Sequence, residues 1–209
     1  MMPTITITAD PTQMSELQNT LAAWPKAADT VLRRAINRAT ARIQSRLVRD
    51  AARFVGIRAS LLRSRAWKLK ARRALVGKVR AGKIGWPLID LNVRKTRKGQ
   101  SVRMYGKRQV IEGAFFAVMP TGHAGIFRRK FYDQANPELR RKRLPIMELR
   151  TDSLTEIVRK AGILPQILSL GEATLAAEVS RQMELVLSQR QGAALAQQAA
   201  AEGFEMGVE

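Results

Sequence analysis

Residues 113–149, GAFFAVMPTGHAGIFRRKFYDQANPELRRKRLPIMEL, decide the fold of this chain. Residues 114–119 form a short apolar run with the length of a buried strand. Residues 120–122, Pro-Thr-Gly, follow as a turn, because proline presets φ and glycine accepts the positive φ of tight turns. Residues 124–127 return as a second strand, so the sequence predicts a β-hairpin.

A basic loop and a third strand follow this hairpin. Residues 128–143 are polar and rich in arginine, and residues 144–149 resume the apolar pattern. The segment offers no evident catalytic group. We therefore expect it to form the nucleus of a sheet, and we expect the loop of residues 128–143 to be its part that contacts a partner.

The longest periodic stretch covers residues 27–54 and predicts an amphipathic helix about 40 Å long at about 1.5 Å per residue. Its apolar stripe consists of Leu32, Ile36, Ala39, Ile43, Leu47, Ala51 and Phe54. A second stripe consists of Arg34, Arg38, Arg42, Arg46, Arg49 and Arg53. Acidic residues at neutralising i,i+4 positions are nearly absent. Two interpretations stay open for this arginine row: a solvated face, or a docking face for anions or an acidic protein.

The rest of the chain predicts short strands and terminal helices. Strands are expected at residues 4–8, 66–79, 88–93, 101–105 and 110–111, a helix start at Asp10 and Pro11, a short helix at 60–65 and a basic turn at 94–100. Ser153 and Glu156 form a capping box, and Pro165 opens a helix to about residue 189. Strands clustered between helices predict the α+β class, with a long N-terminal helix, a central antiparallel sheet and C-terminal helices.

We expect three segments: an N-terminal arm (1–26), a single α+β domain (27–190) and an Ala/Gln-rich helix extension or tail (191–209). At 209 residues and 45% hydrophobic composition, the chain is long enough to bury a core. It has no cysteine, which excludes disulfides and cysteine-ligated zinc. No apolar run is long enough for a transmembrane helix, and residues 1–10 do not resemble a signal peptide.

The charge is concentrated in one sector. The formal net charge is +20, and 25 basic but only three acidic residues lie between Lys26 and Arg108. The remainder holds 12 basic and 14 acidic residues. This distribution indicates a surface that meets a polyanion or an acidic protein.

The sequence contains no recognisable catalytic, metal-binding or nucleotide-binding motif. His123 is the only histidine, and it stands in a glycine-flanked turn without a nearby acidic pair. The spacing of Asp90, Glu112, Asp133 and Glu148 does not indicate a metal pair. There is no phosphate-binding or dinucleotide glycine motif. We expect a non-enzymatic protein without catalytic, cofactor or metal residues.

Four stretches, in this order, carry a family resemblance. They are AINRATARIQSRLVRDAAR (35–53), WPLIDL (86–91), GAFFAVMPTGHAGIFRR (113–129) and RLPIMEL (143–149), the last followed by TDSL. From about residue 20 to about residue 190 the chain resembles the prophage minor tail protein Z family, the tail-completion group of long-tailed phages. The Ala-x-Asn element around Asn37, the hairpin and the third strand are its most specific parts. The C-terminal Ala/Gln extension departs from the family.

The resemblance implies a structural virion protein that acts in tail completion or head-tail joining at the neck, after synthesis in the host cytoplasm. It implies a homo-oligomeric ring, of sixfold symmetry, around the DNA channel. Partners would be the tail terminator, the tail tube or head-completion proteins, with genomic DNA as a further candidate and no membrane. The alternative is a basic DNA-binding or packaging-associated protein. The residues expected to dock partners or DNA are Arg34, Arg38, Arg42, Arg46, Arg49, Arg53, Arg94, Lys95, Arg97, Lys98, Arg128, Arg129, Arg140 and Arg141.

Overall fold

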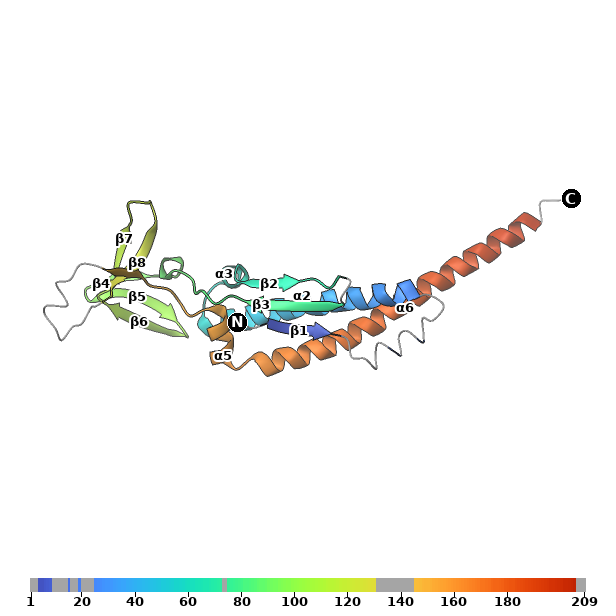
Figure 1. The fold of residues 1–209 in the computed structure, drawn as a ribbon, viewed down its shortest axis with the longest axis horizontal. Coiled ribbons are helices and arrows are strands. Elements are labelled where there is room, and N and C mark those ends of the chain that lie inside the picture. Colours follow the sequence, from blue (N-terminus) through green and yellow to red (C-terminus); the bar gives the residue numbers. More distant parts are fainter. Residues whose placement is uncertain are drawn as a thin grey trace. The chain divides into compact units, whose positions relative to one another are not determined.

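A computed structural model describes residues 4–8, 15, 19, 25–72, 75–130 and 145–205, without the side chains of Pro25 and residues 195–205. The chain is α+β, as predicted, with helices before and after the strands that follow β1 (Figure 1). In order, the elements are β1 (Thr4–Thr8), α2 (Pro25–Val55), α3 (Ala59–Arg63), β2 (Ala66–Leu69), β3 (Val76–Ala81), η1 (Leu88–Asp90), β4 (Arg94–Thr96), β5 (Gly99–Met104), β6 (Lys107–Glu112), β7 (Phe115–Val118), β8 (Ala124–Arg129), β9 (Ile146–Glu148), α5 (Leu154–Ala161) and α6 (Leu164–Glu205).

The chain divides into two compact units. The first unit contains Arg46–Trp67 and Arg80–Leu164, and the second contains Thr4–Ser45, Lys68–Val79 and Pro165–Glu209. Helix α2 contributes its residues 25–45 to the second unit and its residues 46–55 to the first. The single domain expected over residues 27–190 stays a prediction.

In the second unit, α2 packs antiparallel against α6. Near the start of α2, Ala28, Val31 and Leu32 are buried in a cluster with Val186 of α6. Further along both helices, Gly171 lies so close to Ile43 that a Cβ on the glycine would be 2.6 Å from Cδ1 of the isoleucine. Because burial recurs along both helices, apolar packing holds them together.

The predicted apolar stripe of α2 is confirmed except at its end. Every member from Leu32 to Ala51 is buried, whereas Phe54 is 40% exposed. Phe54 instead packs edge-on against Tyr105 at 5.4 Å between ring centroids, within the first unit. The helix ends at Gly56, whose φ of +79° is the left-handed conformation expected of a C-terminal glycine.

Strands β1, β3 and β2 form a three-stranded sheet in that order, and its strand β3 lies against α2. The predicted strand at 66–79 is therefore two separate strands, β2 and β3. Gly77 of β3 approaches α2 so closely that a Cβ there would lie 2.2 Å from the Thr40 hydroxyl. Asn37 of α2 forms two hydrogen bonds with the backbone of Ala71: its Oδ1 accepts from the N–H at 2.7 Å, and its Nδ2 donates to the carbonyl at 3.3 Å.

The first unit contains two antiparallel sheets, β4-β5-β6 and β7-β8-β9. They confirm the predicted hairpin arms at 101–105 and 110–111 and the hairpin of residues 114–127. The basic turn expected at 94–100 is narrower than predicted, because most of its residues pair as β4 and the start of β5. The shared core consists of Leu88, Leu91, Val102, Ala114 and Ile126.

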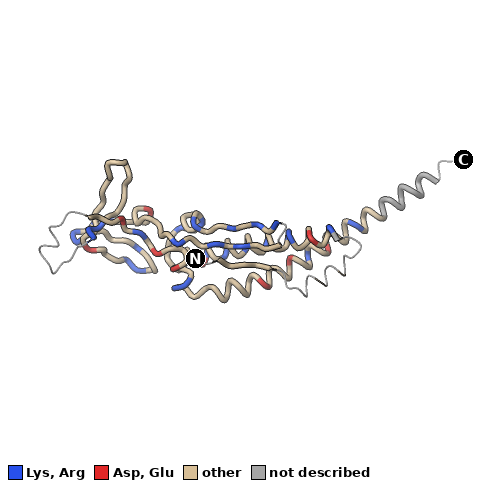
Figure 2. The backbone as a smooth tube through the Cα atoms, viewed as in Figure 1, with Lys and Arg blue, Asp and Glu red and all other residues tan. Residues whose placement is uncertain are grey.

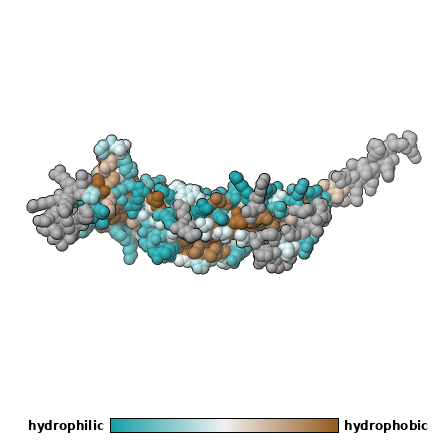
Figure 3. All heavy atoms as spheres, viewed as in Figure 1, coloured by the Kyte–Doolittle hydropathy of each residue, from teal (hydrophilic) through white to brown (hydrophobic). Residues whose placement is uncertain are grey.

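Two predictions fail in this unit. Residues 88–93 are not a strand: Leu88–Asp90 form a 3-10 turn, which places Leu88 and Leu91 three residues apart in the same core. Residues 114–119 are not buried throughout, because Phe116 and Val118 are 55% and 59% exposed. Both side chains lie on the β7–β8 hairpin, whose surface carries apolar groups (Figure 3).

The C-terminal helices follow the predicted signals. The Ser153 hydroxyl accepts a hydrogen bond from the Glu156 N–H and caps α5, which ends at Gly162 with a φ of +61°. Helix α6 continues to Glu205, so the Ala/Gln-rich segment extends the helix at least that far. Leu168 of this helix is exposed. The helix expected to start at Asp10 and Pro11 lies largely outside the described residues.

Candidate anion-binding surface

The arginine row of α2 is exposed along its whole length. Arg34, Arg38 and Arg42 lie in the second unit, and Arg46, Arg49 and Arg53 lie in the first. Arg38 forms an ion pair with Glu178 of α6 at 3.1 Å, and Arg46 forms one with Asp50 at 2.6 Å. Within the described residues the other four have no ion pair. No described carboxylate therefore pairs with these four, and Figure 2 shows how few acidic residues accompany the basic ones from α2 to β6.

The other predicted residues lie in the first unit or outside the described chain. Arg94 and Lys95 are exposed on β4, and Arg97 and Lys98 form the turn to β5. Arg128 and Arg129 are half-buried at the end of β8. Arg140 and Arg141, with most of the predicted loop at 128–143, lie outside the described residues. Part of this set surrounds a hollow of about 590 Å³, which is lined by Lys95, Arg97, Lys98, Arg129, Phe115 and Phe116 among others.

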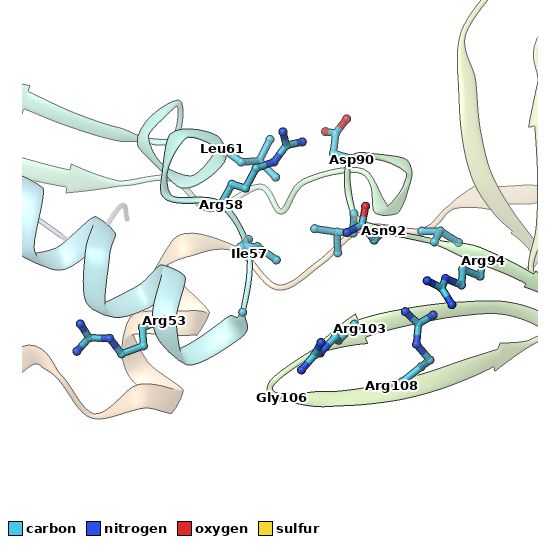
Figure 4. A pocket seen from close by; sticks show the side chains of 13 residues that line it. Arg53, Ile57, Arg58, Leu61, Asp90, Asn92, Arg94, Arg103, Gly106 and Arg108 are labelled. Carbon is cyan, nitrogen blue, oxygen red and sulfur yellow. The ribbon is translucent and has the colours of Figure 1, made fainter.

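A larger pocket of about 950 Å³ lies beside β4 to β6. Its charged lining is five arginines and one carboxylate: Arg53, Arg58, Arg94, Arg103, Arg108 and Asp90. Apolar side chains such as Ile57, Leu61, Leu91 and Val93 complete the wall. In Figure 4, Arg94 and Arg108 point toward one another, whereas Arg103 is directed toward Gly106, and Asp90 and Arg53 point away from Arg94 and Arg108.

The strand register explains this convergence. Arg94 pairs with Ser101 across β4 and β5, and Arg103 pairs with Arg108 across β5 and β6. Residues directly opposite each other share a face of the sheet, as do residues two apart on one strand. Arg94, Arg103 and Arg108 therefore surround Ser101 on one face, and Arg108 Nη1 donates a hydrogen bond to Ser101 Oγ at 3.2 Å. Like charges directly opposite each other destabilise a sheet. A bound anion would therefore reduce the repulsion within this arginine cluster.

The β5–β6 turn holds these arginines in place. Tyr105 and Gly106 both have positive φ, as a two-residue type I′ hairpin requires, although tyrosine adopts this conformation at a cost. Compensating hydrogen bonds run from the Tyr105 N–H to the Val55 carbonyl at 2.8 Å and from the phenol to Asp152. Lys160 donates to the same carboxylate at 2.7 Å. The turn is thus fixed to α2 and α5.

The pKa values of this anchor fit a structural role. Partial burial and the hydrogen bond to Asp152 raise the pKa of Tyr105 above its usual range. Partial burial of Asp152 opposes its ionisation, but hydrogen bonds from Lys160 and Tyr105 prevail and hold its pKa below the usual range. The phenol therefore stays protonated and the carboxylate stays charged near neutral pH.

The sequence predicted only two of the five arginines that line the larger pocket. Arg53 and Arg94 were expected to dock a partner, but Arg58, Arg103 and Arg108 were not singled out. The alternation of Ser101 and Arg103 places both on one face of a strand. The position of Arg108 opposite Arg103 follows from the register of the β5–β6 hairpin.

The structure gives His123 one acidic partner, which is distant in the sequence. Its Nε2 lies 2.8 Å from Oε1 of Glu148 on β9, and Arg150 donates to the other carboxylate oxygen at 2.6 and 2.9 Å. The turn at residue 123 and strand β9 are 25 residues apart in sequence, so only their pairing with β8 brings them together. Burial of Glu148 opposes ionisation, but the hydrogen bonds from His123 and Arg150 prevail and hold its pKa below the usual range.

This ion cluster predicts a pH-dependent contribution to stability. A depressed pKa in the folded state means that the unfolded state binds the proton more readily, so the contribution is present above the usual glutamate pKa and is lost as the pH falls through the folded value. Glu148→Gln should therefore lower the free energy of unfolding near neutral pH, and its difference from the natural chain should shrink in acid. Denaturant titrations across this range measure that difference. A difference independent of pH would contradict the prediction.

Among the described residues no group of three or more histidine or acidic residues is placed to bind a metal. No helix in that part of the chain has the length and apolarity to cross a membrane. No family model matches the chain, and no significant match is found among curated proteins or solved structures.

Proposed function

We propose that the chain is a non-enzymatic structural protein of a phage virion, which acts in tail completion or head-tail joining at the neck. The observation that supports this function best is the exposed arginine row on α2, a helix whose apolar stripe is buried from Leu32 to Ala51. A row of six cations, four of which have no ion pair within the described residues, suits docking against an acidic surface.

The stretches that carry the family resemblance lie at positions that maintain the fold. Residues 35–53 belong to α2, residues 86–91 include η1, and residues 113–129 include the β7–β8 hairpin. Asn37 is one example, because it binds the backbone of Ala71. A shared fold with family members would follow from these contacts, while the charged surface would serve assembly.

Exposed apolar side chains are the second support for assembly. Phe116 and Val118 on β7 and Val110 on β6 lie on outer strands of their sheets. Outer strands with apolar side chains favour pairing with another chain. In the proposed function they contact neighbouring copies in a sixfold ring in the neck of the virion, and the arginine row faces the tail terminator, the tail tube or a head-completion protein.

Charge reversal on α2 tests this proposal. Arg34→Glu, Arg42→Glu and Arg49→Glu together change exposed residues without breaking an ion pair described in the structure. We expect the yield of infectious particles to fall by at least about a hundredfold in a complementation assay, because several charge pairs of about 1 kcal/mol or more would become repulsive. Separated heads and tails should accumulate.

The control variant has the same change in net charge at three arginines outside α2. Arg63→Glu, Arg72→Glu and Arg80→Glu also reverse three exposed arginines and should leave the yield within a few-fold of normal. Both variants should melt near the temperature of the natural protein. Normal yields from a folded α2 variant would rule out the docking role of this row.

A basic DNA-binding or packaging-associated protein is the second candidate, and the arginine-lined pocket favours it. In that case the affinity for duplex DNA would fall steeply with salt, and tails would be completed normally without the protein.

A further inference from the structure

We propose that the pocket of the first unit is a phosphate-binding site, built from Arg94, Arg103, Arg108 and Ser101, which takes the phosphodiester backbone of a nucleic acid. The inference deepens the proposed function and rests on it only for the source of the nucleic acid. The site is separate from the arginines of α2 tested above.

The charge of the cluster is the first argument. Three guanidinium groups occupy one face of three adjacent strands, and Arg103 and Arg108 stand directly opposite each other. None of the three has an ion pair within the described residues, and the hydrogen bond of Arg108 goes to a neutral hydroxyl. The pocket's one lining carboxylate, on Asp90, points away from them (Figure 4). An anion between Arg94 and Arg108 would relieve their repulsion.

The geometry is the second argument. Opposite residues on neighbouring strands lie about 5 Å apart and diagonal ones about 7 to 8 Å apart, so the three side chains span more than one anion. Each guanidinium presents a planar fork of donors that matches the oxygens of a phosphate. A ligand that repeats one charge per nucleotide fits such a row better than isolated carboxylates of an acidic protein.

The rest of the pocket suits a nucleotide backbone. Its volume of about 950 Å³ holds more than a single inorganic anion. Ile57, Leu61 and Val93 offer apolar contacts for sugars beside the charged groups. The Tyr105 anchor fixes the turn between the strands that carry Arg103 and Arg108, so the backbone of the site needs little ordering when a ligand binds.

Binding measurements on the purified full-length chain test the proposal. The probes are a fluorescent oligothymidylate, the corresponding duplex and inorganic phosphate. The test variant is Arg94→Gln, Arg103→Gln and Arg108→Gln together, and the matched control is Arg63→Gln, Arg72→Gln and Arg80→Gln, which removes the same charge from exposed positions. We expect the test variant to bind the oligonucleotides at least about tenfold more weakly than the control. Its slope of log affinity against log salt should be smaller by about two to three, at about 0.7 to 0.9 per lost phosphate contact.

A second variant covers the case in which the first does not fold. Arg94→Lys, Arg103→Lys and Arg108→Lys keep the charge but lose the planar fork, so we expect a smaller, several-fold loss of oligonucleotide affinity. If inorganic phosphate binds the natural chain as tightly as the oligonucleotides do, and the test variant no longer binds it, the ligand of the site is free phosphate and not a nucleic acid.

Three outcomes would overturn the proposal. They are equal losses in the test and control variants, unchanged oligonucleotide binding in a folded test variant, and a polyglutamate that competes as well as DNA at equal charge. These measurements do not involve particles. A failure of phosphate binding would therefore leave the α2 result standing, and normal particles from the α2 variant would leave the binding result standing.

Discussion

Gly85→Ala is expected to unfold the first unit under conditions in which the natural chain is folded. A Cβ at Gly85 would lie 1.8 Å from the carbonyl oxygen of Thr151 and 2.7 Å from its carbon. Neither backbone is free to move away, because the Thr151 N–H donates to the Trp86 carbonyl at 2.8 Å and the Trp86 N–H donates to the Thr151 hydroxyl at 3.0 Å. We expect a loss of about 3 kcal/mol or more, since a clash between two fixed backbones exceeds ordinary overpacking.

The fluorescence of Trp86 during denaturant unfolding would report this loss, because its side chain is buried and its indole N–H donates to the Leu61 carbonyl at 2.9 Å. Gly192→Ala is the matched control. It lies in α6, where an added Cβ meets nothing within 4 Å. Alanine there should be neutral or stabilising by up to about 1 kcal/mol. Equal stabilities of the two variants would show that the close approach at Gly85 is absent in solution.

Asn37→Leu is expected to destabilise the second unit by about 2 to 4 kcal/mol. The substitution keeps a similar volume but removes both hydrogen bonds to the backbone of the buried Ala71. A buried N–H and a buried carbonyl would then be left unsatisfied, at about 1 to 3 kcal/mol each. The loss would explain why an asparagine stands in the Ala-x-Asn element of the sequence.

Asn37→Asp distinguishes the contributions of the two hydrogen bonds between Asn37 and Ala71. The carboxylate still accepts from the Ala71 N–H at the position of Oδ1 but cannot donate to the Ala71 carbonyl, so its stability should fall between those of the natural chain and Asn37→Leu. Thermal unfolding followed by circular dichroism measures all three proteins. A leucine variant as stable as the natural chain would mean that this contact does not hold α2 to the strand region.

Local patterns in the sequence predicted the elements whose signals are themselves local. The apolar stripe of α2, the hairpin turn at residues 120–122 and the cap at Ser153 all depend on residues within about one or two turns of each other. The α+β class followed from the order of these elements. The sequence also predicted that the α2 arginines are exposed, because a helix that buries its apolar stripe turns its charged stripe toward solvent.

The tertiary structure decided the features that depend on strand register and long-range packing. Leu88–Asp90 form a 3-10 turn because Leu88 and Leu91 both enter a core that distant strands create. Glu148 reached His123 only through β8, and Arg108 met Arg103 only across the β5–β6 hairpin. The sequence by itself therefore determined that the chain is a basic α+β protein with an arginine-rich helix. Only pairing between strands decided which arginines share a pocket, because a shift of one residue in register would turn them to the opposite face.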